Sequence, residues 1–365
     1  MSFADRLSAQ PEAVARPVFR SNVTPVPQQS SADQNSPASQ NSPASQSSPA
    51  ASQQAPDNSF FALWEKPDVP QPTKTLKLYP KGQNVDMGIV ENGKPVTLGP
   101  GESNGLSGEE RVIRDGWIFN INDNARINIY PPENPNGEMV VVTPGGGYEF
   151  VSSWNEGEYV AKWLNERGIA ACTVYYRLPN KHYNVPLTDV QNAFRYCRAN
   201  AAKWKVSHIG VMGFSAGGHL AACASTLFPD DATRPDFAAL IYAYTDLNTE
   251  AFSKSATNCT GHFTHGDKEK KDFYSMHRRV TRETPPTILI ISENDDKVDT
   301  INSVEYYSAL RANGVPCELH IIGAGKHGWG FPNPENGKDK LPANLRSSVT
   351  ATLESWLEGY RNYGK

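Results

Sequence analysis

The sequence has few cysteines, and they form no pattern that would hold a metal or a disulfide framework. Its five cysteines are scattered, their number is odd, and no Cys-x-x-Cys pair occurs. This argues against a zinc knuckle and against a fold stapled by disulfides. Cys172, Cys223 and Cys317 lie within apolar stretches, where a free cysteine typically packs as a small buried hydrophobic residue.

The sequence also lacks an excess of positive charge and any long apolar run. It has 35 Lys and Arg against 39 Asp and Glu, a net charge of -4, so nucleic acid is not expected as a partner. No apolar run approaches the roughly 18 residues that span a bilayer. Residues 1–20 lack the apolar core and flanking signals of a signal peptide. We therefore expect no membrane span, and a protein that stays inside the cell unless the sequence is a trimmed form.

Residues 21–58 differ in composition from the rest of the chain. Ser, Pro and Gln fill 23 of these 38 positions, no aromatic residue occurs, and the hexapeptide at 35–40 is repeated at 41–46. Such a stretch buries too little apolar surface to offset the entropy of ordering. We expect residues 1–58 to be a disordered N-terminal tail or linker and residues 59–365 to form a folded domain.

Residues 60–125 are rich in Pro, Gly and Asn, and we expect one or two extended strands there. Beyond them, apolar runs alternate with helical patterns. The expected strands are Arg126–Tyr130, Met139–Thr143, Ala170–Tyr175, His208–Phe214, Ala238–Tyr244, Thr287–Ser292 and Cys317–Ile322. The expected helices are Glu156–Glu166, Leu187–Lys203, Gly217–Phe228, Ile301–Ala312 and Leu345–Tyr360. Continuous apolar strands alternating with helices predict an α/β fold, with a mostly parallel sheet covered by helices on both faces.

The strongest chemical signal is Gly213-Phe214-Ser215-Ala216-Gly217, a Gly-x-Ser-x-Gly motif. It follows an expected strand and precedes an expected helix, the setting of a nucleophile elbow. A side chain at either glycine would clash with the neighbouring strand or helix in so sharp a turn. The motif predicts Ser215 as a nucleophile held above the carboxyl edge of the sheet.

A glycine-rich segment, Thr143-Pro-Gly-Gly-Gly-Tyr148, follows an earlier expected strand. Glycines let the backbone approach a ligand closely and present N–H groups to it. We expect Gly146 or Gly147 to form an oxyanion hole with the N–H of Ala216. An ordinary flexible loop is the alternative, whereas a phosphate-binding loop would be followed by Gly-Lys-Ser/Thr.

A nucleophilic serine needs a base, and the base needs an orienting acid. His327 lies on a glycine-flanked loop after the last expected strand, where it can reach the serine. Asp295 follows the strand Thr287–Ser292 and is the expected acid, with Asp296 as the second choice. Asp246 is more typical of a cap or turn. The order serine, acid, histidine is that of α/β-hydrolases.

Residues from about 103 to 356 resemble the esterase branch of the α/β-hydrolases that includes acetylxylan esterases and feruloyl-esterase-type enzymes. The matching segments, in family order, are Asn104-Gly-Leu-Ser-Gly-Glu109, Pro144-Gly-Gly-Gly-Tyr148, Tyr176-Arg-Leu-Pro179, Gly213-Phe-Ser-Ala-Gly-Gly-His219, Asp295-Asp-Lys-Val298 and Gly325-Lys-His-Gly-Trp-Gly330. The resemblance implies the α/β-hydrolase fold and places the acid three residues before Val298, which favours Asp295.

The expected function is a serine carboxylesterase that removes acetyl groups from xylan or xylo-oligosaccharides, without metal or cofactor. Feruloyl esterase and general carboxylesterase are the alternatives, and a non-catalytic carbohydrate-binding protein on the same fold is the alternative from another class. Enzymes that act on plant polysaccharide usually leave the cytoplasm, so the resemblance favours a secreted or periplasmic protein if the sequence is a trimmed form. Aromatic faces suit sugar rings, and the expected pocket residues are Tyr148, Trp154, His219 and Trp329.

Arg177 lies in the turn after the strand Ala170–Tyr175. A charged side chain beside a buried strand must find a partner or reach water. We expect a structural ion pair with an acid such as Asp189 rather than a substrate contact.

Overall fold

The computed structural model describes residues 69–79, 90–91, 94–95, 109–113, 116–121, 124–179, 183–248, 268–331 and 339–362. The chain divides into two compact units, residues 1–66 and 67–365, and all described residues belong to the second. The expected tail, residues 1–58, lies outside the described residues and stays a prediction. Cys259 and His182 lie outside them as well.

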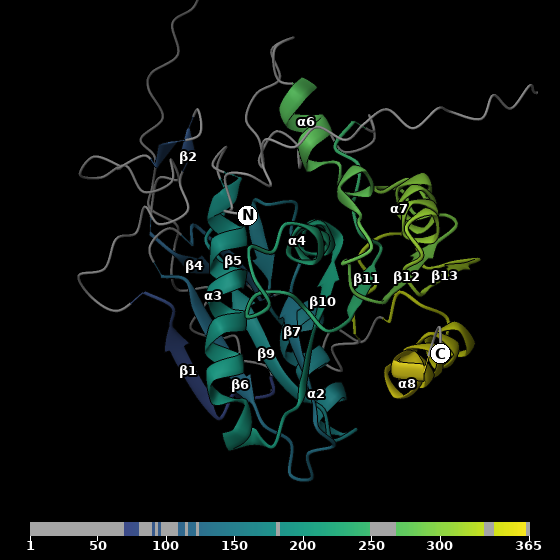
Figure 1. The fold of residues 1–365 in the computed structure, drawn as a ribbon. Coiled ribbons are helices and arrows are strands. Elements are labelled where there is room, and N and C mark those ends of the chain that lie inside the picture. The colour runs from purple at the N-terminus through teal and green to yellow at the C-terminus, as the bar shows by residue number, and fades with distance from the viewer. Residues whose placement is uncertain are drawn as a thin grey trace, which may run out of the picture. The chain divides into compact units, whose positions relative to one another are not determined.

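The core of the second unit is an eight-stranded sheet (Figure 1). The strands, in their order across the sheet, are β1 (Lys74–Lys77), β6 (Arg126–Tyr130), β9 (Ala170–Tyr175), β7 (Glu138–Thr143), β10 (His208–Phe214), β11 (Ala238–Ile241), β12 (Thr287–Ser292) and β13 (Cys317–Ile322). The six strands from β9 to β13 are parallel, and β6 runs antiparallel to both β1 and β9. The central strands β7, β9, β10 and β12 are almost wholly buried, as their continuous apolar sequences require.

Helices cover both faces of this sheet. They are the π-helical turn η2 (Trp154–Glu158), α2 (Tyr159–Asn165), α3 (Asn184–Asn200), η3 (Ala201–Trp204), α4 (Ser215–Thr226), α6 (Lys268–Tyr274), η6 (Met276–Arg279), α7 (Ile301–Ala312), α8 (Ala343–Gly359) and η7 (Tyr360–Asn362). Helices α3 and α4 pack together over the middle strands. Figure 1 shows β12 and β13 between α7 and α8. The expected α/β fold, with a mostly parallel sheet and helices on both faces, is confirmed.

Smaller sheets come mainly from the segment where only one or two strands were expected. β4 (Arg111–Val112), β5 (Trp117–Phe119) and β8 (Phe150–Ser152) form an antiparallel three-stranded sheet, and β2 (Val90–Glu91) pairs with β3 (Lys94–Pro95). β8 follows the glycine-rich segment directly, so this sheet places β5 beside that loop.

Several expected elements, including β7, α2, α3 and α8, differ from their expected bounds by a few residues, and two further differences concern residues near Ser215. The strand expected over Ala238–Tyr244 ends at Ile241, because Tyr242 has a φ of 38°, which extended backbone does not adopt. The helix expected from Gly217 begins at Ser215, so the serine itself opens the helix.

Arg177 forms the expected buried ion pair with Asp189. Both side chains are fully buried, and Arg177 Nη2 lies 2.7 Å from Asp189 Oδ1. The Arg177 backbone N–H also donates to Asp189 Oδ2 over 2.8 Å. Tyr79 completes the cluster: its hydroxyl donates to Asp189 over 2.6 Å and accepts from Arg177 Nη2. The cluster joins the segment after β1 and helix α3 to the turn after β9.

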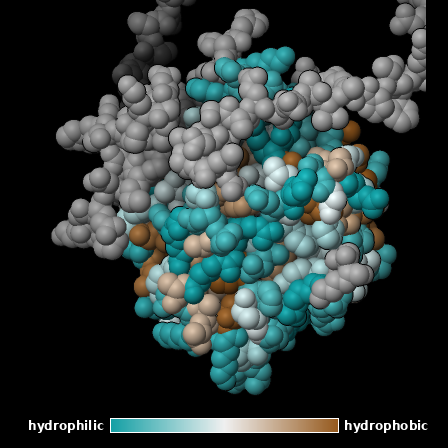
Figure 2. Space-filling view, in the orientation of Figure 1, coloured by the Kyte–Doolittle hydropathy of each residue, from teal (hydrophilic) through white to brown (hydrophobic). Residues whose placement is uncertain are grey.

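On the face seen in Figure 2, the described residues are mainly polar, and hydrophobic residues lie in small separate groups among them. None of the described helices is long and apolar enough to cross a bilayer. The four described cysteines, Cys172, Cys197, Cys223 and Cys317, are free thiols, and the first three are buried.

Candidate active site

Ser215 lies on a strained turn between β10 and α4. Its φ is 53°, a left-handed value that is uncommon for a residue with a side chain. Such strain persists only where the surrounding packing enforces it, and it gathers at functional sites. Because α4 starts at Ser215, the Ala216 N–H lies in the first helical turn, where N–H groups have no partner within the helix.

The two glycines of the motif are required by close packing. A Cβ on Gly213 would collide with the carbonyl oxygen of Gly217 in α4, and a Cβ on Gly217 would collide with the carbonyl oxygens of Thr143 and Pro144. These contacts are with backbone atoms, which cannot swing aside. The turn therefore fixes Ser215 directly beside the glycine-rich segment that follows β7.

The structure brings Ser215, His327 and Asp295 into one hydrogen-bonded chain. Ser215 Oγ lies 2.8 Å from His327 Nε2, and His327 Nδ1 lies 2.9 Å from Asp295 Oδ2. A carboxylate only accepts hydrogen bonds, so in the neutral imidazole Nδ1 carries the proton. His327 Nε2 then accepts from the Ser215 hydroxyl, as a general base must.

Asp295 is buried and oriented by its own turn. Its side chain is 0% exposed, and Oδ1 accepts the backbone N–H groups of Lys297 and Val298 over 2.9 and 2.8 Å. The neighbouring Asp296 is exposed and lines the cavity described below, without a contact to His327 among the described hydrogen bonds. Of the two carboxylates considered from the sequence, the structure places Asp295 against the histidine.

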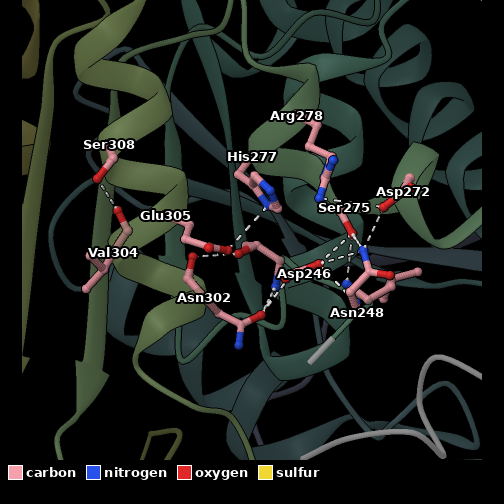
Figure 3. Close-up of polar contacts among 12 residues, drawn as sticks. Asp246, Asn248, Asp272, Ser275, His277, Arg278, Asn302, Val304, Glu305 and Ser308 are labelled. Carbon is pink, nitrogen blue, oxygen red and sulfur yellow. Dashed lines mark hydrogen bonds and ion pairs between the residues drawn. The ribbon is translucent and has the colours of Figure 1, made fainter. Parts of the chain in front are cut away.

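Asp246 lies in a separate polar network (Figure 3). Its Oδ1 accepts from Ser275 Oγ over 2.6 Å and from the backbone N–H of Asn248 over 2.9 Å, which are the contacts of a turn carboxylate. Asp246, His277 and Glu305 each offer a ligand atom within 4.8 Å of one another. These three are the described residues that could hold a metal ion, and none of them lines the cavity at Ser215.

The glycine loop, defined here as Gly145–Gly147, forms a tight turn beside Ser215. Gly146 has a φ of 129° and Gly147 a φ of 62°, and the Gly146 carbonyl accepts from the N–H groups of Glu149 and Phe150. A Cβ on Gly146 would overlap the Phe150 carbonyl. Gly146 and Gly147 line the same cavity as Ser215 and His327, so this loop faces the serine.

This cavity has a volume of about 940 Å³. Its described lining consists of Trp117, Gly146, Gly147, Glu149, Phe150, Ser152, Asn155, Glu156, Ser215, Asn294, Asp296, Lys297, Ala324, Gly325, Lys326, His327, Gly328, Lys340 and Pro342. Trp117 and Phe150 stack in its wall, with ring centroids 4.4 Å apart and planes inclined by 17°. The volume is much larger than an acetyl group needs and is in the range of small-molecule sites.

The four aromatic and histidine residues expected in the pocket do not line this cavity. Tyr148, Trp154, His219 and Trp329 are all buried in the core. Tyr148 directs its hydroxyl to His219 Nδ1 at 2.7 Å, and Trp329 donates its indole N–H to Ser292 Oγ over 3.1 Å. Trp154 packs its ring over Gly116. Trp117 and Phe150 take the place in the cavity wall that these residues were expected to fill.

Two further residues beside the site, Glu156 and Tyr242, were not found from the sequence. Burial raises the pKa of the Glu156 carboxyl, while hydrogen bonds from Tyr242 and the Gly145 N–H oppose that rise. Burial and the nearby Glu156 raise the pKa of the Tyr242 phenol well above its usual value. The available signal was an acidic residue at the buried start of a helix and a tyrosine at the carboxyl end of a buried strand.

The other histidines that the structure describes fit structural or surface roles. His219 is buried, with Nε2 2.8 Å from the Tyr274 carbonyl. His320 lies on β13 with Nε2 2.8 Å from Glu318 Oε2, and His208 opens β10 near Glu138. His262 and His265 lie outside the described residues. The arrangement at Ser215 thus has a hydroxyl, a base, an orienting carboxylate and N–H donors, which are the groups needed for acyl transfer.

Two curated proteins are similar to this chain. An acetylxylan esterase from Xylanibacter ruminicola is 38% identical over 236 residues, covering 63% of this chain and 49% of that protein. Endo-1,4-beta-xylanase B from Butyrivibrio fibrisolvens is 28% identical over 212 residues, covering 54% of this chain and 33% of that protein. The chain therefore spans half or less of the length of each relative.

A solved structure covers more of the chain. The acetyl ester-xyloside bifunctional hydrolase from Caldicellulosiruptor lactoaceticus is 28% identical, with a TM-score of 0.62, covering 81% of this chain and 99% of that one. A family described as alpha/beta hydrolase fold matches residues 140–331, a range that includes the glycine loop, the serine elbow and His327. From the sheet order, the elbow and this match over more than half of its length, the chain belongs to the α/β-hydrolase family.

Proposed function

We propose that this protein is a serine carboxylesterase that removes acetyl groups from xylan or xylo-oligosaccharides. The observation that carries the proposal is the hydrogen-bonded chain from Ser215 through His327 to Asp295, with Ser215 and His327 in the wall of the cavity. Similarity to an acetylxylan esterase and to an acetyl ester-xyloside hydrolase supports the acetyl and xylan parts.

In the proposed reaction, His327 Nε2 takes the Ser215 proton as Oγ attacks the ester carbonyl carbon. The carbonyl oxygen becomes an oxyanion held by the N–H of Ala216 and of Gly146 or Gly147. Asp295 holds the imidazole in the required tautomer and stabilises its cation. His327 then gives the proton to the departing sugar oxygen. A water molecule repeats the attack on the acetyl-enzyme and releases acetate, which restores the Ser215 hydroxyl.

The stacked pair Trp117 and Phe150 is the proposed platform for the sugar chain. Aromatic faces suit the C–H faces of sugar rings, and a cavity of about 940 Å³ leaves room beyond the acetyl group. The same volume and rings favour feruloyl esterase as the second candidate, because a feruloyl group needs a long aromatic acyl pocket. In that case Trp117 and Phe150 would hold the acyl group instead of the sugar.

One set of assays tests the proposal. Hydrolysis of 4-nitrophenyl acetate that disappears in Ser215→Ala distinguishes an esterase from a non-catalytic carbohydrate-binding protein. Acetate release from acetylated xylan, compared with ferulate release from methyl ferulate, then separates the two esterase candidates. Ferulate release that exceeds acetate release in kcat/KM would reverse the substrate assignment, and full activity of pure Ser215→Ala protein would overturn the mechanism.

A further inference from the structure

Glu156 is a buried carboxylate beside the site that the Ser215, His327 and Asp295 chain does not use. It is 4% exposed, lies in the π-helical turn η2 and reaches the cavity wall. Among the described residues no Lys or Arg lies within ion-pair distance of it. Burying an unpaired carboxylate costs several kcal/mol, and π-helical turns often occur at functional sites. Glu156 therefore needs an explanation beyond packing.

The two oxygens of Glu156 bind two different loops. Oε2 accepts the backbone N–H of Gly145 over 2.8 Å, at the start of the glycine loop. Oε1 accepts the Tyr242 hydroxyl over 2.8 Å. The Tyr242 oxygen in turn accepts the backbone N–H of Gly330 over 2.9 Å. Gly330 belongs to the histidine loop, defined here as residues 325–331, so Glu156 and Tyr242 bridge the loops on either side of Ser215.

The hydrogen bonds of this bridge run toward Glu156. A backbone N–H only donates, so the Tyr242 oxygen accepts from Gly330, and the Tyr242 hydroxyl donates to Glu156 Oε1. Both Glu156 oxygens therefore accept, which is the pattern of an ionised carboxylate. A neutral amide in its place has one accepting oxygen and leaves one of the two donors facing an NH₂ group.

A second contact from η2 strengthens the bridge. The Asn155 carbonyl accepts the Phe331 N–H over 2.7 Å, so neighbouring residues of one turn hold both ends of the arrangement. One of the bridged residues is strained, because Tyr242 has a φ of 38°. Such backbone persists only where surrounding bonds over-determine it, and the hydrogen bonds of the Tyr242 hydroxyl to Glu156 and Gly330 are two of those bonds.

We propose that Glu156 is a positioning residue for ester hydrolysis, which holds the glycine loop in register with the histidine loop through Tyr242. The inference rests on the proposed esterase function. The Gly145 N–H is fixed by Glu156, and the next two residues carry the N–H groups proposed for the oxyanion. Oxyanion donors act only when they are held at the correct distance. Loosening this loop should therefore reduce the enzyme's stabilisation of the transition state more than its binding of the substrate.

The test compares Glu156→Gln with the wild-type enzyme on 4-nitrophenyl acetate and with phenylboronic acid as a tetrahedral adduct of Ser215. We expect kcat to fall about 10- to 100-fold, KM to change less than about 3-fold, and boronate affinity to fall by a similar factor to kcat. Tyr242→Phe, which removes the link but keeps the Glu156–Gly145 bond, should lose less, about 3- to 10-fold. Glu156→Asp keeps the charge with a shorter reach and should recover only part of the loss.

The matched control is Glu158→Gln, a buried carboxylate in the same turn that does not line the cavity. It should leave kcat of the folded enzyme within about 3-fold, whatever its effect on melting temperature. Unchanged kcat and boronate affinity in folded Glu156→Gln would overturn the inference, as would equal losses in the Glu158→Gln control. If Glu156→Gln does not fold, Tyr242→Phe decides by the same two measurements. Wild-type activity that survives Ser215→Ala would instead count against the proposed function.

Discussion

Two buried networks in this molecule combine the same three kinds of group: a carboxylate, a nitrogen base and a hydroxyl. One consists of Asp295, His327 and Ser215, and the other of Asp189, Arg177 and Tyr79. The second is closed, with both charged side chains fully buried. In the first, the His327 side chain is 14% exposed and borders a cavity of about 940 Å³.

The nitrogen base makes the difference between the two networks. Burial by itself would lower the pKa of Arg177, but Asp189 and Tyr79 raise it, so the guanidinium keeps its proton. Its network can only hold the segment after β1, helix α3 and the turn after β9 together. An imidazole exchanges its proton near neutral pH, and the open cavity lets a substrate oxygen or water accept that proton. A reactive cluster thus differs from a structural one less in its buried charge than in two other properties: a base that can exchange its proton, and a cavity that gives substrate access to that base.

The largest effect is expected from substitutions that break the network of Ser215, His327 and Asp295. Ser215→Ala and His327→Ala should each lower kcat on 4-nitrophenyl acetate by about 10⁶-fold, and Asp295→Asn by about 10⁴-fold. The double variant at Ser215 and His327 should cost little more than either change alone, because the residues act as a unit. Melting temperatures should stay close to that of the wild type. Losses that multiply in the double variant would contradict a shared mechanism.

The next largest effect is expected from substitutions that break the network of Arg177, Asp189 and Tyr79. Arg177→Ala leaves a buried, uncompensated Asp189 carboxylate, and we expect a loss of about 3–5 kcal/mol in unfolding free energy by urea denaturation. The folded fraction should keep its kcat. Replacing both Arg177 and Asp189 by leucine should cost less than the sum of the two single changes. A variant that changes only KM and leaves stability untouched would show that Arg177 contacts substrate.

The Arg177 pair shows what a sequence can reveal about such clusters. A charged residue after a buried strand signals a partner nearby, and the ion pair with Asp189 is confirmed. The strands β6, β9, β10, β12 and β13 have the bounds expected from the sequence. Among them, β9 and β12 are largely apolar and buried along their whole length, as strands inside a parallel sheet are. Both the charged residue and the apolar run are patterns of neighbouring residues in the chain.

The cavity wall depends on contacts that no local pattern reveals. Trp117 and Phe150 stack because β5 pairs with β8, and these three-residue strands lie about 30 residues apart in the chain. Tyr148 has a φ of 58°, and its side chain packs in the core instead of in the cavity wall. The pairing of β5 with β8 and the left-handed backbone of Tyr148 thus decide which aromatic ring faces the cavity. Neither feature produces a periodic pattern in the sequence.

A third buried network, around His219, has no carboxylate among the described partners of its histidine. His219 accepts the Tyr148 hydroxyl at Nδ1 and donates from Nε2 to the Tyr274 carbonyl, and burial lowers its pKa from 6.5 to about 4. Below pH 6.5, therefore, His219 binds a proton in the unfolded chain, whereas in the folded chain it stays neutral until about pH 4. Stability is lost as pH falls through this window, by about 2 kcal/mol between pH 7 and pH 5.

Urea denaturation at pH 7 and at pH 5 measures this effect. The matched variant is His219→Gln, which cannot titrate, and it should lose about 2 kcal/mol less than the wild type between the two pH values. Equal losses in the two proteins would mean that His219 is protonated in the folded state. It would then need an acidic partner, and the contrast with the carboxylate-bound His327 would fail.

The smallest expected effect concerns Asp296, which borders the cavity but is exposed to solvent. Asp295 has its Oδ2 2.9 Å from His327 Nδ1, whereas Asp296 adds only a charge that water and salt screen. Asp296→Asn should therefore change kcat on 4-nitrophenyl acetate less than about 3-fold, and less again at 0.5 M salt. Asp295→Asn is the control, since its effect depends on a direct bond and should not respond to salt. A severe loss in Asp296→Asn with near wild-type Asp295→Asn would make Asp296 the orienting acid, and would mean that the loop after β12 rearranges when substrate binds.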